Sequence, residues 1–202
     1  MAARLLHGYA AGALALFLSS GAPGGAETNP LRTEATNAMR RGAQFFHERV
    51  AVNGTYLWNY SEDLARREGE GKASATLGWV QPPGTPAVGM AFVRAHEVTG
   101  DSYYLDAARE TALGLVAGQL RSGGWTYSIE FEPAERKKAA YRDGGGRTGR
   151  NTTTLDDDTT RSAVRFLLGL DTALKFEHAA IHRCAGKPVK GSIPEWGMAA
   201  GL

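Results

Sequence analysis

Cysteine is nearly absent from this chain of 202 residues. The single Cys184 excludes an internal disulfide in a monomer, so the stability of the fold must come from packing. No C-x-x-C, H-E-x-x-H, G-x-S-x-G or P-loop pattern occurs, which leaves zinc peptidases, serine hydrolases and nucleotide-binding proteins without support. The hydrophobic fraction of 43% is nonetheless large enough for one globular domain with its own core.

Long hydrophobic runs and a strong net charge are missing as well. The apolar run Ala10 to Leu18 follows a short positive region and precedes small residues at 24–26, which is typical of a secretory signal peptide over residues 1–26. This run is shorter than the ~20 residues of a membrane span, so we expect a secreted or periplasmic protein without a stable membrane anchor. Removing the peptide lowers the formal charge from +2 to +1, because Arg4 is its only charged residue. No general attraction to nucleic acid follows.

Helical periodicity dominates the chain after the signal peptide. Apolar spacing predicts helices over residues 32–50, 87–99, 102–120 and 159–175, the first with a buried stripe of Met39, Ala43, Phe46 and Val50. Thr85 and Asp101 are expected as N-caps, and helices are expected to end at Gly100 and at Gly123. The very short turn at Gly100 predicts an antiparallel helical hairpin. The expected fold class is therefore all-α.

Four segments interrupt this helical pattern. Alternating side chains at 125–131 predict a short β element, and three prolines in 79–86 predict irregular backbone. The polar run 61–72 suggests a loop with one helical turn or two. Residues 132–150 gather arginines and lysines around a glycine triplet, and we expect a mobile, solvated linker there rather than a ligand clamp.

Three adjacent aspartates, Asp156, Asp157 and Asp158, precede the helix expected at 159–175. Asp158 is suited to cap that helix, which leaves two carboxylates more than capping requires. Carboxylate oxygens are ligands for hard cations such as calcium. From spacing alone, a solvated cap with acidic neighbours remains the alternative. The helix that follows has an apolar face composed of Ala163, Phe166, Leu167, Leu170 and Leu174.

Taken in order, four segments resemble the secreted pectate lyases of polysaccharide lyase family 10, the pectic acid lyases. They are WNYSED at 58–63, WVQPPGTPAVG at 79–89, GQLRSGGWTYSIEF at 118–131 and LDDDTTRSAVRFL at 155–167. The resemblance implies an α/α toroid of antiparallel helical hairpins over residues 27–182, incomplete in this chain. After His182 the pattern stops, and residues 183–202 are expected to form a divergent irregular tail, as truncation or a shifted reading frame would produce.

The resemblance also implies an activity, the cleavage of pectate by calcium-assisted β-elimination. Calcium held by Asp156, Asp157 and Asp158 would make the C5 proton of the uronate more acidic, and an arginine base would remove it. No arginine here matches that base, so the catalytic residues are unassigned and the chain is expected to be inactive as given. Core packing is the alternative role for each aromatic candidate. The candidates for contact with this acidic plant-type polysaccharide are Trp58, Tyr60, Trp79, Trp125, Tyr127 and Arg161.

Other functions remain open at this stage. The chain could be a non-catalytic binder of acidic polysaccharide, or a glycoside hydrolase on a helical barrel, which needs only two carboxylates at a suitable separation. The pair Asp157-Asp158 also resembles the acidic motif of class II terpene cyclases. That motif requires an aspartate where Leu155 stands, and export does not suit such substrates, so this reading is disfavoured.

Overall fold

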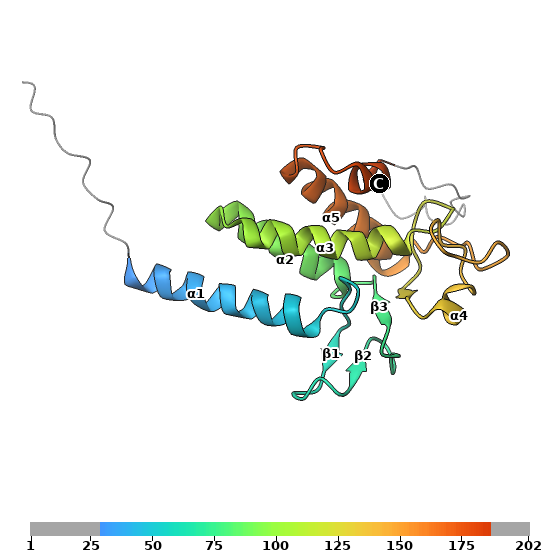
Figure 1. The fold of residues 1–202 in the computed structure, drawn as a ribbon, viewed down its shortest axis with the longest axis horizontal. Coiled ribbons are helices and arrows are strands. Elements are labelled where there is room, and N and C mark those ends of the chain that lie inside the picture. The colour runs from blue at the N-terminus through green and yellow to red at the C-terminus, as the bar shows by residue number, and fades with distance from the viewer. Residues whose placement is uncertain (1–28, 187–202) are drawn as a thin grey trace, which may run out of the picture.

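In the computed structural model, residues 29–186 are described; the expected signal peptide and residues 187–202 of the expected tail lie outside them. Helices α2 (Thr85–Thr99), α3 (Ser102–Gly118) and α5 (Thr159–Ala173) pack against one another and supply most of the core (Figure 1). The short helix α6 (Ala179–Ala185) lies against α5 and α3. No helix within residues 29–186 is both long enough and apolar enough to cross a membrane.

The predicted hairpin of two helices is present as α2 and α3. Gly100 ends α2 in the left-handed conformation, with φ of 71°, and the Asp101 carboxylate accepts a hydrogen bond of 3.0 Å from the Tyr103 amide, so both caps are confirmed. The predicted cap at Thr85 is wrong. Thr85 is the first helical residue, and its buried hydroxyl accepts a hydrogen bond of 3.0 Å from the amide of Tyr56 instead.

Helix α3 ends at Gly118, not at Gly123 as the glycine pair suggested. Gln119 adopts an extended backbone, and its buried side chain donates hydrogen bonds to the carbonyls of Gly123 at 2.8 Å and Cys184 at 3.2 Å. These tertiary bonds fix the chain reversal that residue spacing could not locate.

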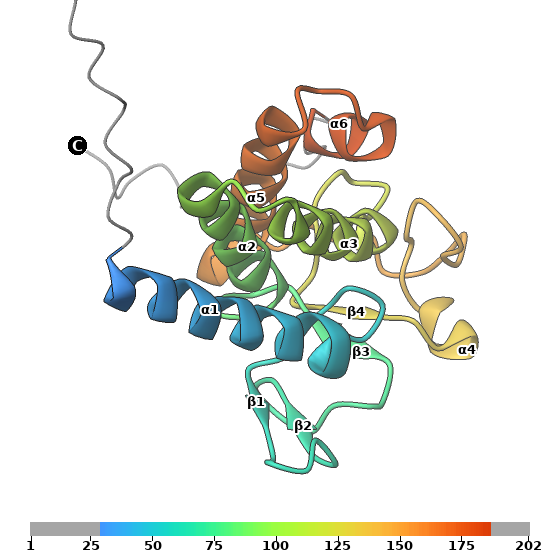
Figure 2. The same cartoon turned by 60° about the vertical axis from the view of Figure 1, so that its left-hand side comes forward.

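The first helix is α1 (Pro30–Phe45), continued by the π-helical turn η1 (Phe46–Val50). The predicted buried stripe is wrong except at Val50, because no residue of α1 is buried and Met39 is 39% exposed. Figures 1 and 2 both show α1 beside the bundle, on the side opposite α5 and α6. A groove of about 360 Å³ with apolar walls lies between α1 and α2. Periodicity therefore identified the apolar face but not whether a partner covers it.

Four short strands form two antiparallel pairs. Strand β1 (Asn59–Tyr60) pairs with β2 (Arg67–Glu68), and β3 (Leu77–Trp79) pairs with β4 (Ser128–Glu130). The β element expected at 125–131 is thus confirmed as β4. The helical turns suggested for 61–72 are wrong: this segment forms the β1–β2 hairpin, and Arg67 fixes it by donating to the carbonyl of Ala75 at 2.7 Å.

Residues 132–150 are anchored rather than free, contrary to the expected linker. After the single turn α4 (Pro133–Arg136), the Arg136 guanidinium donates to the carbonyls of Glu130 at 3.0 Å and Asp143 at 2.6 Å. It also lies 4.4 Å from the ring centre of Tyr141, which is buried. The basic residues of this segment therefore serve packing in part.

The apolar face predicted for α5 is confirmed at Ala163, Phe166, Leu167 and Leu170, which are fully buried, whereas Leu174 is the C-cap residue and is partly buried. Helix α6 runs to Ala185, three residues into the expected irregular tail, because Cys184 and Ala185 are buried against the core. Closure of the helical hairpins into a toroid stays a prediction.

Candidate functional site

Two tryptophans and one glutamine form the centre of the candidate site. Trp58 precedes β1 and Trp79 ends β3, and their rings pack edge to face with centroids 5.6 Å apart. Gln81 receives both indoles: Trp58 donates to its backbone carbonyl at 3.0 Å and Trp79 to its side-chain Oε1 at 3.3 Å. Both tryptophans are half-buried, whereas Gln81 is only 6% exposed. Gln81 thus holds two partly exposed aromatic rings, Trp58 through its backbone carbonyl and Trp79 through its side chain.

The same glutamine joins the tryptophans to the acidic cluster. Its Nε2 donates to Asp157 Oδ2 at 2.9 Å, and the Tyr127 hydroxyl donates to the neighbouring Asp156 Oδ2 at 3.3 Å. Tyr127 belongs to the chain entering β4, which pairs with β3 beside Trp79. We call Trp58, Trp79, Gln81, Tyr127, Asp156 and Asp157 the acidic–aromatic surface.

The acidic cluster has an unusual backbone. Asp157 and Asp158 have φ of 49° and 59°, the left-handed region that aspartate tolerates better than most residues. Asp158 occupies the N-cap position of α5, yet its carboxylate pairs with the Arg161 side chain and caps no amide, so the predicted capping bond is absent. The aspartates therefore differ in role: Asp156 and Asp157 are exposed toward the aromatic residues, and Asp158 is occupied by Arg161.

The three aspartates are the residues expected to hold calcium. Within residues 29–186 no group of three or more acidic, histidine or cysteine side chains is arranged to hold a metal ion. The carboxylates of Asp156, Asp157 and Asp158 have three different partners, Tyr127, Gln81 and Arg161, and the calcium site stays a prediction. Calcium takes six to eight oxygen ligands.

Tyr127 has a hydroxyl suited to donating a hydrogen bond. Partial desolvation and the carboxylate of Asp156 both raise the pKa of Tyr127, because they disfavour a second negative charge at this place. The hydroxyl therefore keeps its proton and holds the Asp156 side chain toward β4.

Trp125 was a candidate for contact with the polysaccharide, and the structure gives it the alternative role, core packing. It is completely buried, and its indole nitrogen donates to the carbonyl of Leu115 in α3 at 2.8 Å. Because its polar edge is satisfied inside the core, Trp125 joins α3 to the start of α5, where Thr160 Oγ1 accepts from its amide at 3.2 Å. The alternation of apolar and polar residues along the sequence could not show that Trp125 is buried whereas Trp79 is half-buried.

Arg161 is exposed on the first turn of α5 and is bound to Asp158. The hydrogen bond and the charge of this carboxylate raise the pKa of Arg161 above its ordinary value. A guanidinium that holds its proton more firmly is a poorer base, so this geometry favours a binding role over proton abstraction.

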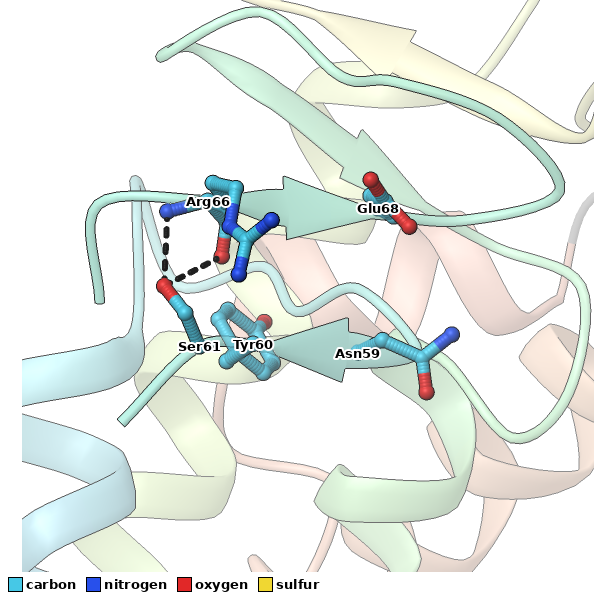
Figure 3. Close-up of a pocket in the computed structure, with 5 residues that line it drawn as sticks. All are labelled: Asn59, Tyr60, Ser61, Arg66 and Glu68. Atoms are coloured by element: carbon cyan, nitrogen blue, oxygen red, sulfur yellow. Dashed lines mark hydrogen bonds between the residues drawn. The ribbon is translucent and has the colours of Figure 1, made fainter. Parts of the chain in front are cut away.

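Tyr60 lies away from the aspartates, on the β1–β2 hairpin. Its hydroxyl accepts a hydrogen bond of 2.5 Å from the Leu57 amide, and desolvation raises its pKa. Its ring borders a hollow of about 250 Å³ lined by Asn59, Tyr60, Ser61, Arg66 and Glu68, which we call the hairpin hollow (Figure 3).

Local hydrogen bonds shape this hollow and engage the hydroxyls of Tyr60 and Ser61. The Ser61 hydroxyl accepts from the Arg66 amide at 2.9 Å, which closes the turn, and Trp58 donates its amide to the Glu68 carbonyl at 3.0 Å. Among residues 29–186 the Arg66 guanidinium has no hydrogen bond or ion pair. Figure 3 shows it beside Ser61 and Tyr60. The hollow thus adjoins the acidic–aromatic surface through β1 and β2.

Sequence reasoning missed Gln81 and Arg66. Gln81 lies inside the segment 79–89 that carries the resemblance, but no spacing pattern in the sequence shows that a single glutamine side chain bonds an aspartate far along the chain. Arg66 was placed in a polar loop, and only strand pairing shows which of the neighbouring arginines is free: Arg67 is bound to main-chain carbonyls.

Comparisons with known proteins gave no matching family model and no match among curated proteins. Among solved structures, the chain is similar to a family 10 polysaccharide lyase from Cellvibrio cellulosa, with a TM-score of 0.42 and 18% identity. It is similar at a TM-score of 0.41, again with 18% identity, to an aspartate-to-alanine mutant of that enzyme in complex with trigalacturonic acid. Each match covers 77% of this chain, which spans 43% of the length of the matched structures.

Proposed function

We propose that this chain is a secreted, polysaccharide lyase-like protein that binds pectate with the help of calcium. The observation that carries this proposal is the pair of hydrogen bonds from Gln81 to Asp157 and from Tyr127 to Asp156. Together with the contact between Trp58 and Trp79, they join on one surface all four segments whose sequences resemble pectate lyases. Four separate, weak motifs support a common function more strongly when their side chains converge.

The charge of the surface supports the need for a cation. Asp158 is neutralised by Arg161, but Asp156 and Asp157 are exposed and paired only with neutral groups. A uronate carboxylate approaching two aspartates is repelled, by about 1 kcal/mol for each pair of unit charges at 4 Å in water. A bound calcium ion would reverse this repulsion and make the C5 proton of the uronate more acidic. The binding of pectate should therefore depend on calcium.

The neutral and basic residues have distinct proposed roles. Trp79 and Trp58 present partly open rings on which sugar faces can stack. Arg66 in the hairpin hollow can bind a uronate carboxylate through two parallel hydrogen bonds, and Asn59 can bond sugar hydroxyls. The hollow is smaller than the ~300–1,000 Å³ of a drug-sized ligand pocket, so we assign it one sugar residue of a longer chain.

The base of a β-elimination is not assigned to any described residue. Arg161 is unsuited to this role because Asp158 stabilises its charged form. This observation favours the second candidate function, a binding protein for acidic polysaccharide without turnover. Binding without unsaturated product would identify that alternative, and new reducing ends without unsaturated product would indicate a hydrolase.

Affinity electrophoresis in gels containing polygalacturonate, with calcium or with a chelator, tests the binding proposal. We expect retardation only with calcium, and none in gels containing a neutral polysaccharide. Asp157→Asn should reduce the retardation. The matched control Asp106→Asn removes an exposed aspartate on α3, paired with Arg109, and should leave it unchanged. Retardation that is the same with chelator, or equal loss in both variants, would contradict the proposal.

A further inference from the structure

A second polar cluster lies where α1 and η1 meet α3. Tyr103 of α3 is its centre. The Arg40 guanidinium lies 3.9 Å from the ring centre of Tyr103 and pairs with Asp101, the cap of α3. His47 and Glu48 of η1 both reach the hydroxyl of Tyr103.

Three hydrogen bonds converge on this hydroxyl and on the imidazole ring. His47 Nδ1 lies 3.0 Å from the Tyr103 hydroxyl, and His47 Nε2 lies 2.9 Å from Glu110 Oε2. The Tyr103 hydroxyl donates to Glu48 Oε1 at 3.2 Å. The side chain of His47 is 14% exposed, so water has limited access to the ring.

These three contacts require three hydrogens. A neutral imidazole has one N–H and the tyrosine has one O–H, so the neutral state leaves one contact without a hydrogen. If Nε2 carries the hydrogen, the tyrosine must choose between His47 and Glu48; if Nδ1 carries it, a bare Nε2 faces the carboxylate of Glu110. With both carboxylates ionised, only the imidazolium, with two N–H groups, satisfies all three bonds. We infer that His47 is held as an imidazolium and that this cluster is a pH-sensitive clamp fastening α1 and η1 to α3.

The groups around the ring agree with this assignment. Glu48 comes from η1 itself, and Tyr103 and Glu110 come from α3. Helix α2 contributes the uncharged ring of Phe92, 6.3 Å from the imidazole, and α1 contributes Arg40 on the far side of Tyr103. Desolvation and the Glu48 carboxylate raise the pKa of Tyr103 to about 12, so its hydroxyl remains a donor at neutral pH.

The clamp affects how firmly α1 and η1 are attached to α3. No residue of α1 is buried, and Arg40 of α1 and His47 of η1 bond this helical segment to the start and the middle of α3. The bond made by the second N–H exists only in the imidazolium, so a rise in pH that removes this proton removes that bond and its contribution to holding the first helical segment on α3. We therefore expect α1 to be fastened in mildly acidic solution and loosened in mildly alkaline solution.

Hydrogen exchange of the full chain, followed by mass spectrometry, tests this clamp. Exchange in peptides from residues 30–50 is compared between pH 5.5 and pH 8.0 after correction for the intrinsic rate. A charge-assisted hydrogen bond corresponds to on the order of tenfold in an equilibrium at a partly exposed site, so the corrected exchange of this segment should be about tenfold faster at pH 8.0. Peptides from α5 serve as the internal reference and should respond little.

Two neighbouring tyrosines supply matched variants. Tyr103→Phe keeps the ring beneath Arg40 but removes the hydroxyl, so only Glu110 needs a hydrogen and the pH response of residues 30–50 should weaken. Tyr104→Phe is the control, because the Tyr104 hydroxyl is buried without a hydrogen-bond partner among the described residues. An equal pH response in both variants would overturn the inference. Faster exchange in the α5 peptides would reveal a Tyr103→Phe variant that fails to fold. In that case the wild-type comparison decides, and exchange of residues 30–50 that does not depend on pH would overturn the inference.

Discussion

Removing the side-chain amide of Gln81 should separate the acidic cluster from the tryptophans. Gln81→Ala deletes the bond of 2.9 Å to Asp157 and the bond of 3.3 Å from Trp79. A hydrogen bond to a charged group contributes about 1.5–3 kcal/mol and a neutral one about 0.5–1.5 kcal/mol. Water can replace the partner of the exposed Asp157, which lowers the net cost. We expect the free energy of unfolding to fall by about 1–2 kcal/mol, or roughly 2–8 °C in Tm.

A double-mutant cycle with Asp157→Ala separates this interaction from general damage to the core. Unfolding is followed by circular dichroism in urea for the wild type, both single variants and the double variant. Because the two side chains share a direct bond, the effects should be non-additive by about 1 kcal/mol. Additive effects within about 0.3 kcal/mol would refute the claim that Gln81 connects these segments.

Three further outcomes are expected. Gly89→Ala should destabilise the fold by about 1–3 kcal/mol in urea unfolding, because the added methyl group would overlap the Phe166 ring. Gly42→Ala in α1 places its methyl group in open space and should stabilise the fold slightly. Equal effects of the two variants would contradict the packing described. Arg66→Ala should weaken calcium-dependent retardation by polygalacturonate severalfold while Arg165→Ala, on the exposed side of α5, should not, and unchanged binding of both would remove the hairpin hollow from the site. Absorbance of unsaturated product should remain ~10²- to 10⁴-fold below the rate of an enzyme with a positioned base, and rapid turnover would show that the base is present and misassigned.

The sequence predicted helix boundaries well where residues within one turn of the boundary determine it, and poorly where a distant contact does. The caps at Gly100 and Asp101 act within one turn, so the sequence located the α2–α3 hairpin closely. The end of α3 was misplaced because Gln119 bonds to Cys184, which lies far along the chain. The first helix was predicted as a helix, but its stripe was wrongly placed in the core, since periodicity does not reveal whether a face is covered.

The sequence predicted which residues belong to the candidate site better than it predicted how their side chains are arranged. The three aspartates were identified, yet the left-handed backbone of Asp157 and Asp158 and the pairing of Asp158 with Arg161 give the three carboxylates different partners. Trp79 and Trp125 have similar sequence surroundings, and only the carbonyl of Leu115 shows that Trp125 belongs to the core. The strands β1 and β2, of two residues each, are too short for any periodic signal, so the hairpin hollow was not foreseen.

Isothermal titration of a short oligogalacturonate into the full chain, with calcium and with a chelator, tests the central claim most directly. The wild-type chain should bind in calcium and show no measurable heat of binding in chelator. The Asp156→Ala, Asp157→Ala double variant should lose the calcium-dependent binding, while circular dichroism confirms that its helices remain. Binding of equal affinity with and without calcium, or calcium-dependent binding that survives in the double variant, would contradict the account.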